Sequence, residues 1–382
     1  MPSVSAAGIA HLPRQRWQIA PADAEAAAAL GAAVGLSPLL AQLLINRGIS
    51  DPDEARTYLA PEQLVLPDPR EEFEDLVESL LLLEEAIAGG VKIAICGDYD
   101  ADGMTSTALL LRALRNLGAT VDYAIPSRMT DGYGINRRIV EEFAADGVGL
   151  ILTVDNGIAA YDAIARAREL GLAVIITDHH DLPPQLPPAN AILNPKLLPP
   201  ESPYAGLAGV GVAYVLAICL AQQLERLQDF ATPLLELFTL GTIADLAPLT
   251  GVNRRWVQRG LRRLPQSQNP GIQALMLAAG VEPRNSTLRP EDIGFRLGPR
   301  IHAIGRIGDP QIVIDLLTTD HWKVAQERAQ DCEQNNNHRK ALCERIEREA
   351  VAWVEQQGFD PEVQRVLVVV QPDWHHGVIG IV

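Results

Sequence analysis

Residues 91–103 read Val-Lys-Ile-Ala-Ile-Cys-Gly-Asp-Tyr-Asp-Ala-Asp-Gly, and this stretch decides the fold. Its first six residues are rich in β-branched side chains and predict a short buried strand, while helical spacing begins at about Thr105. Three carboxylates therefore lie between a strand and a helix. Acids at alternate positions can direct several oxygen ligands at one divalent cation, and the flanking glycines allow a tight turn. We predict that Asp98, Asp100 and Asp102 bind a metal ion.

The alternation of strand and helix continues downstream of this stretch. Strand-like runs at 120–125, 149–154 and 172–177 alternate with helical patterns at 136–145 and 159–170. Helices of this length between strands are typical of parallel sheets covered on both faces. The sequence therefore predicts an α/β domain with a mostly parallel sheet flanked by helices.

Further metal-ligating residues follow the later strands. Asp155 comes directly after the third predicted strand, and Asp178-His179-His180 comes directly after the fourth. In parallel sheets, ligands bind beyond the carboxyl ends of the strands, so these side chains are expected at one edge. A carboxylate and a neutral imidazole suit a cation such as manganese. Asp245 is the one charged residue of an apolar segment, 242–248, and a buried acid of this kind needs a partner.

Simpler interpretations stand beside this one. The first motif could be an acidic surface loop without metal, Asp155-Asn156-Gly157 could be only a turn, and Asp245 could be a helix cap. A calcium loop of the EF-hand kind is disfavoured because its twelfth position, normally Glu, is Leu109 here. The sequence contains neither a Gly-x-Ser-x-Gly motif nor a phosphate-binding loop of the Walker type.

Composition and charge restrict the class of protein. The 382 residues are enough for more than one domain, and the four widely spaced cysteines with no secretory-type opening favour a reducing cytoplasm. The net charge of minus 16 disfavours a polyanionic partner in general. However, residues 251–306 contain ten arginines against three acids, a net charge of plus seven. Such a segment can provide a basic face for nucleic acid.

Four domains or segments are expected along the chain. Residues 1–70 predict an N-terminal helical extension, 71–319 the α/β domain and 320–357 a long connector helix. The remaining segment, 358–382, contains a strand-like run at 366–370 and is interpreted as the truncated start of a second α/β domain.

The order of these motifs resembles that of the DHH phosphoesterase superfamily and is most similar to its RecJ branch of single-strand-specific exonucleases. Residues 374–380 likewise resemble the opening of the DHHA1 substrate-binding domain of that family. Family II inorganic pyrophosphatases are disfavoured because they have a histidine where Cys96 stands. The resemblance implies two manganese or magnesium ions. It implies six ligands, namely Asp98, Asp100, Asp102, Asp155, His179 and Asp245.

The resemblance also implies roles around the metal ions. Asp98 and Asp100 would take part in catalysis, and His180 would lie close to the scissile phosphate as a transition-state stabiliser or acid. Arg128 would contact the 5'-terminal phosphate, although a solvated arginine is the simpler interpretation. Arg300, Arg306 and Asn156 are further candidates for substrate binding, with structural ion pairs as the alternative for the two arginines.

The function expected from this resemblance is metal-dependent 5'-to-3' hydrolysis of single-stranded DNA to 5'-mononucleotides in repair and recombination. One rival is a small-substrate phosphodiesterase acting on short oligoribonucleotides or cyclic dinucleotides, and the other is a non-catalytic DNA-binding relative. The expected partners are single-stranded DNA and a single-strand-binding protein or helicase, without a membrane. We expect the chain to be a monomer.

Overall fold

The computed structural model describes residues 17–129, 131–229, 231–281, 288–358 and 364–382. The chain divides into two compact units, Met1–Leu64 and Val65–Val382, which are described separately. No single helix in the described ranges is long and apolar enough to cross a membrane. The helices Ala24–Val34 and Pro38–Ile45 are long and apolar enough only when taken together, and the chain bends by 108° between them.

The first unit is a small helical cluster. It comprises α1 (Ala24–Val34), α2 (Pro38–Ile45), α3 (Pro52–Leu59) and the 3-10 turn η1 (Pro61–Gln63). The side-chain oxygens of Asp23, Ser37 and Asp51 cap α1, α2 and α3 respectively, because each accepts a hydrogen bond from a backbone amide in the first turn. Small and branched apolar side chains then close its core: Ala27, Leu30, Ala41, Leu44, Ile49 and Ala55.

A five-stranded parallel sheet forms the centre of the second unit. Its order is β2-β1-β3-β4-β5. Successive residues of β1 point to opposite faces, so Ile93 and Ile95 join one core, while Ala94 and Cys96 join the other. The strands are β1 (Lys92–Cys96), β2 (Val121–Ala124), β3 (Val148–Val154), β4 (Ala173–Thr177) and β5 (Ala191–Leu193).

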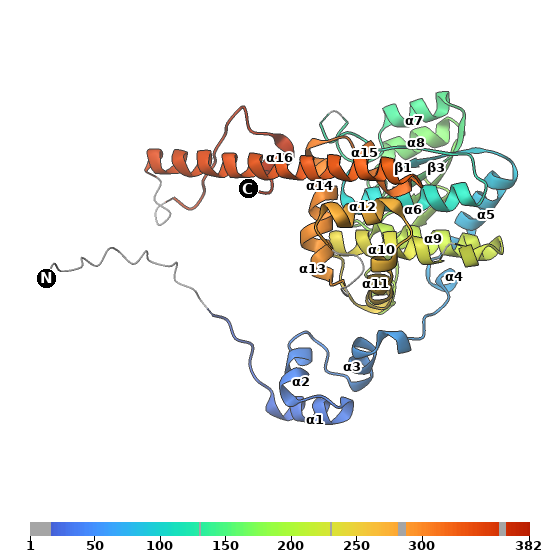
Figure 1. Ribbon diagram of the computed structural model, residues 1–382. Coiled ribbons are helices and arrows are strands. Elements are labelled where there is room, and N and C mark those ends of the chain that lie inside the picture. The colour runs from blue at the N-terminus through green and yellow to red at the C-terminus, as the bar shows by residue number, and fades with distance from the viewer. Residues whose placement is uncertain (1–16, 130, 230, 282–287, 359–363) are drawn as a thin grey trace. The chain divides into compact units, whose positions relative to one another are not determined.

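Helices cover both faces of this sheet, as Figure 1 shows. Helices α7 and α8 pack on the sheet face to which Ala94 and Cys96 point. Helices α5, α6, α9 and α10 contribute to the larger core on the opposite face. The helices up to this point are α4 (Pro69–Glu72), α5 (Leu76–Ala88), α6 (Ala101–Asn116), α7 (Arg137–Ala145), α8 (Tyr161–Glu169), η2 (Pro195–Leu197), α9 (Gly209–Gln223), η3 (Leu227–Asp229) and α10 (Ala231–Ala244).

The remaining helices extend the larger core. They are α11 (Gly251–Arg263), η4 (Leu264–Gln266), α12 (Pro270–Ala278), α13 (Pro290–Asp292), the π-helical turn η5 (Ile293–Leu297), α14 (Gly298–Ile307), α15 (Gln311–Thr318), α16 (Trp322–Gln357) and α17 (His376–Ile379). The first half of α16 packs on α12, α14 and α15 through buried residues that include Ala325, Ala329 and Cys332. At 36 residues, α16 is ~54 Å long.

The α/β class and the four predicted strands are confirmed, and three differences have physical causes. Strand β5 lies in a proline-rich segment and is only three residues long, too short for a period to be visible. Residues 366–370 form no strand because, among the described residues, no strand pairs with them; they lie largely exposed. Helix α6 begins at Ala101 and not at Thr105, because Asp100 caps it.

Candidate metal centre

The acidic residues gather at the carboxyl edge of the sheet. Asp98 follows β1, Asp155 follows β3 and His179 follows β4. Strands β1 and β3 are neighbours although β2 lies between them in the chain, so the strand order reverses at this pair. Ligands bind in open α/β sheets at such a switch point. The topology therefore explains why distant parts of the chain meet here.

The loop after β1 and the start of α6 present three acids at different depths. The carboxylate of Asp100 caps α6 by accepting the amide of Gly103 at 3.0 Å. Asp102 lies in the first turn of the helix and is fully buried, and Asp98 is nearly so. The three alternate acids therefore do not all lie on a loop: Asp98 precedes the helix, Asp100 caps it and Asp102 belongs to its first turn.

The six predicted ligands and His180 form three groups, and within each group the ligand atoms lie within 4.8 Å of one another. Asp155 and His179 each belong to two groups, so the groups share ligands. The groups are Asp98, Asp100 and Asp155; Asp102, His179 and Asp245; and Asp155, His179 and His180. An arrangement with shared donors of carboxylate and imidazole type suits neighbouring divalent cations.

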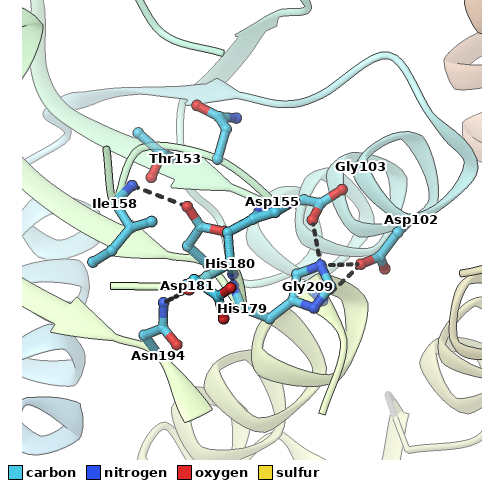
Figure 2. A network of polar contacts seen from close by, with 12 residues as sticks. Asp102, Gly103, Thr153, Asp155, Ile158, His179, His180, Asp181, Asn194 and Gly209 are labelled. Atoms are coloured by element: carbon cyan, nitrogen blue, oxygen red, sulfur yellow. Dashed lines mark hydrogen bonds and ion pairs between the residues drawn. The ribbon is translucent and has the colours of Figure 1, made fainter. Parts of the chain in front are cut away.

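His179 lies between Asp155 and Asp102, which belong to different ligand groups. Its Nε2 lies 3.0 Å from Asp155 Oδ1 and 3.5 Å from Asp102 Oδ2, and Figure 2 shows the imidazole between these carboxylates. Burial and the neighbouring His180 lower the pKa of His179 to about 4. The ring is therefore neutral at physiological pH, which is the state that a metal ligand requires.

The N-terminus of α9 fixes the position of Asp102. One carboxylate oxygen of Asp102 accepts the amide of Gly209 at 2.7 Å (Figure 2). The other accepts the amide of Val210 at 2.8 Å. A Cβ atom on Gly209 would lie 2.8 Å from the Cβ of Asp155 and 3.0 Å from Oδ2 of Asp102, so only glycine fits. The sequence did not predict the contact of Asp102 with the amides of Gly209 and Val210, and the glycine at position 209 was the only local indication of it.

The carboxylates repel one another in this buried setting. Burial and then the charge of Asp100 raise the pKa of Asp98 to about 7, and burial likewise raises that of Asp245 to about 6. The pKa values of Asp102 and Asp155 are also raised by burial and by the acids around them. Oδ1 of Asp98 accepts no hydrogen bond from the described residues, and Oδ1 of Asp155 has the contact with His179 but accepts no hydrogen bond from them. Bound cations would supply the missing partners, so the donor set fits metal ions.

Asp155 and Asn156 occupy a strained turn after β3. Asp155 has a φ of 59°, in the left-handed region that few residues other than glycine adopt. The Asn156 amide donates to the carbonyls of Cys96 and Val154, and its oxygen accepts the amide of Ile135. Asn156 is buried and holds β1, β3 and the segment before α7 together. Its role in substrate binding remains a prediction.

His180 is oriented by Asp178 at the rim of the cluster. The Nδ1 atom of His180 lies 2.7 Å from Asp178 Oδ1, and this hydrogen bond raises the pKa of His180. Burial acts to raise the pKa of Asp178, but hydrogen bonds from His180 and from the Ile158 amide outweigh burial and lower it. The Tyr133 hydroxyl donates to the Asp155 carbonyl at 2.8 Å and lies 3.2 Å from His180 Nδ1. The sequence reasoning assigned Tyr133 no role in the site.

Two of the three predicted arginines border the acids. Arg128 stacks on the ring of Tyr99 with its guanidinium carbon 4.0 Å from the ring centroid, and its charge partly offsets the rise in the pKa of Asp98 that burial and Asp100 cause. Arg306 donates to the carbonyl of Gly377 at 3.2 Å. Arg300 instead forms an ion pair with Glu333 of α16.

Several other arginines of the basic segment 251–306 have partners within the protein. Arg296 pairs with Asp292. The arginines of α11 at 254, 255, 259 and 262 have partners within the protein. Arg284 lies outside the described residues. The basic face therefore remains a prediction, and the arginines next to the acids are the stronger candidates.

The comparisons with known proteins agree with this geometry. The DHH family, N-terminal domain, matches residues 92–242. The chain is 39% identical over 369 residues to the single-stranded-DNA-specific exonuclease RecJ of Bacillus subtilis (strain 168), covering 97% of this chain and 45% of that protein. The identity to RecJ of Escherichia coli (strain K12) is 36% over 358 residues, with 91% and 61% covered. The chain spans between 45% and 64% of the length of such curated relatives.

Solved structures give the same result. A crystal structure of exonuclease RecJ bound to manganese has a TM-score of 0.73 at 36% identity, covering 81% of this chain and 76% of that one. RecJ of Thermus thermophilus in complex with Mn2+ has a TM-score of 0.77 at 34% identity, with 93% and 49% covered. The same protein in complex with Mg2+ has a TM-score of 0.69.

Proposed function

Because the chain belongs to the RecJ family of single-stranded-DNA-specific exonucleases, we propose that it hydrolyses single-stranded DNA from the 5' end. The reaction releases 5'-mononucleotides, and its cellular setting is DNA repair and recombination. The observation that supports the proposal is the convergence of the six predicted acid and imidazole ligands into shared groups next to the carboxyl ends of the strands.

Two divalent ions, Mn2+ or Mg2+, fit the shared ligand groups. When bound, they would lower the pKa of a water molecule and stabilise the attacking and leaving oxygens of a phosphodiester. Asp98 and Asp100 would serve one ion, Asp102 and Asp245 the other, and the shared residues Asp155 and His179 would bridge or join the two groups.

His180 does not need to be a metal ligand in this mechanism. Asp178 holds its ring by Nδ1 and favours the protonated form, so the ring can donate a hydrogen bond to a phosphate oxygen or a proton to the leaving group. Tyr133 touches the same ring and restricts its rotation. The side chains that contact His180 therefore orient a proton donor toward the substrate.

The positive charge beside the acids gives the strand a place to bind. Arg128 and Arg306 are half-buried, and neither pairs with a carboxylate among the described residues. A phosphate group of the strand would complete their hydrogen bonding. This supports a polyanionic substrate in spite of the net charge of minus 16.

The decisive experiment compares a single strand labelled at its 3' end, a matching duplex and dinucleotides, each with Mn2+, with Mg2+ or with a chelator. The matched variant is Asp155→Asn, because asparagine accepts the left-handed backbone and removes only the charge. We expect stepwise shortening of the single strand, slow attack on the duplex, and loss of activity of at least about 1000-fold in the variant.

Other outcomes identify the rivals. Dinucleotide hydrolysis as fast as that of long strands would favour the small-substrate phosphodiesterase. Binding of the strand without cleavage under all metal conditions would favour the non-catalytic relative. Cleavage that persists in the chelator would remove the metal mechanism.

A further inference from the structure

A polar cavity lies at the ends of α6 and α10 that are remote from the metal centre. Each helix has its other end at the metal centre, because Asp102 lies in the first turn of α6 and Asp245 directly follows α10. Arg112 of α6 and Glu236 of α10 line the cavity, and ~15 Å of helix separates each from those ligands. The cavity has a volume of about 470 Å³, which is typical of a small-molecule site.

Glu236 is a buried acid in the wall of this cavity. It is 4% exposed and lies between Leu235 and Leu237 in the apolar helix α10. Its Oε2 accepts the hydroxyl of Ser267 at 2.5 Å, while Oε1 accepts no hydrogen bond from the described residues. Burial raises the pKa of Glu236 to about 7, although Ser267 and the charges of nearby arginines act against burial. A buried carboxyl group with an unused oxygen favours a ligand that carries an N–H donor.

Two arginines line the same cavity. Arg112 is held in place, because its Nη1 donates to the Thr318 carbonyl at 2.9 Å and its Nη2 pairs with Asp320 at 2.9 Å. Arg263, in the last turn of α11, is exposed and forms neither a hydrogen bond nor an ion pair with the described residues. The first turn of α10 also lines the cavity, and its backbone amides add partial positive charge. This side of the cavity is therefore suited to an anionic group.

We propose that the cavity is a second ligand site, which binds a nucleoside monophosphate with its phosphate at Arg263 and Arg112 and an amino group of its base at Glu236. Guanidinium groups bind phosphate oxygens through paired hydrogen bonds, and carboxylates accept hydrogen bonds from the amino groups of bases. An inorganic anion alone would leave Oε1 of Glu236 without a donor. The site does not depend on the proposed function, because no metal ligand takes part in it.

Isothermal titration tests the site with dAMP, dCMP, dGMP, TMP and inorganic phosphate, each added to the Mg2+-loaded protein. We expect the three nucleotides with an amino group on the base to bind about 10-fold more tightly than TMP, which lacks one. Glu236→Gln keeps an acceptor for Ser267 and should remove this preference. Arg263→Gln should weaken the binding of all four nucleotides about 10-fold. The same titrations in Asp155→Asn separate this site from the metal centre.

The control is Arg115→Gln, which changes an exposed arginine of α6 that does not line the cavity. It should bind the nucleotides as the wild type does. Arg263→Lys keeps the charge but not the paired geometry and should lose about three-fold, so it decides the matter if Glu236→Gln does not fold.

Three outcomes would overturn the proposal. Nucleotide binding that is lost in Asp155→Asn but kept in Arg263→Gln would place the ligand at the metal centre. Inorganic phosphate that binds as tightly as the nucleotides would leave the base without a role. Absence of binding for every nucleotide would remove the site, while hydrolysis of single-stranded DNA by the same protein would leave the proposed function intact.

Discussion

Replacing Gly209 by alanine should weaken the binding of Mn2+ about 10- to 100-fold, because a misplaced neighbour of a metal ligand costs this much affinity. The added Cβ would lie 2.8 Å from the Cβ of Asp155, 2.9 Å from its Oδ1 and 3.0 Å from Oδ2 of Asp102. These atoms belong to two short, buried side chains, so the carboxylates or α9 must shift. The loss corresponds to about 1.4 to 2.7 kcal/mol. Alanine favours the helix by at most about 1 kcal/mol, which acts on folding and not on metal affinity.

Isothermal titration with Mn2+ measures this effect directly. The matched control is Gly211→Ala on the same helix, where the new Cβ meets Cδ2 of Leu207, the movable end of a flexible side chain. We expect the control to bind Mn2+ within about two-fold of the wild type, since it leaves the ligands in place. Thermal melting in a chelator checks that both variants fold. Wild-type affinity in Gly209→Ala, or equal weakening in both variants, would refute the reasoning.

Three further predictions concern side chains around and away from the cluster. Burial raises the pKa of Glu236 to about 7 from 4.5. The folded state therefore holds this proton more tightly than the unfolded state, so the free energy of unfolding should fall by on the order of 3 kcal/mol between pH 4.5 and 8. Urea unfolding should show a weaker pH dependence in Glu236→Gln, and an unchanged dependence would contradict the assignment. Tyr133→Phe removes one hydroxyl next to His180 and should lower kcat about five-fold, because one neutral hydrogen bond is worth about 1 kcal/mol. The affinity for Mn2+ should change little. A large loss of Mn2+ affinity with unchanged kcat would show that Tyr133 acts on the metal ligands instead. Asn156→Ala should cost about 2 to 4 kcal/mol in urea unfolding, since it removes three buried hydrogen bonds; unchanged stability with a raised KM would indicate a substrate contact instead.

The sequence predicted the sheet because its signals are local. Strands β1, β3 and β4 are largely apolar runs of five to seven residues, and β2 is a shorter run of four residues that includes Asp122. An acid or imidazole placed after such a run points to the strand ends without knowledge of distant contacts, which explains why Asp98, Asp155 and His179 could be grouped in advance. Strand β5 was missed because a run of three residues has no visible period.

Other parts of the site depend on contacts that no local pattern encodes. The amides of Gly209 and Val210 reach Asp102 across more than 100 residues of chain. A structural ion pair was one of the two interpretations of Arg300, but its partner Glu333 could not be identified from the sequence, because the pair joins two helices. The sequence identifies side chains that can do chemistry, but it does not show which of them are already engaged with the protein.

The sharing of Asp155 and His179 between ligand groups has a thermodynamic consequence. Occupancy of one position fixes the orientation of a donor that the other position also uses, and it removes part of the repulsion among the acids. By reciprocity, each ion must then change the affinity for the other by the same factor. The two ions would therefore not load independently, and the fraction of molecules with both ions would differ from that expected for two separate positions.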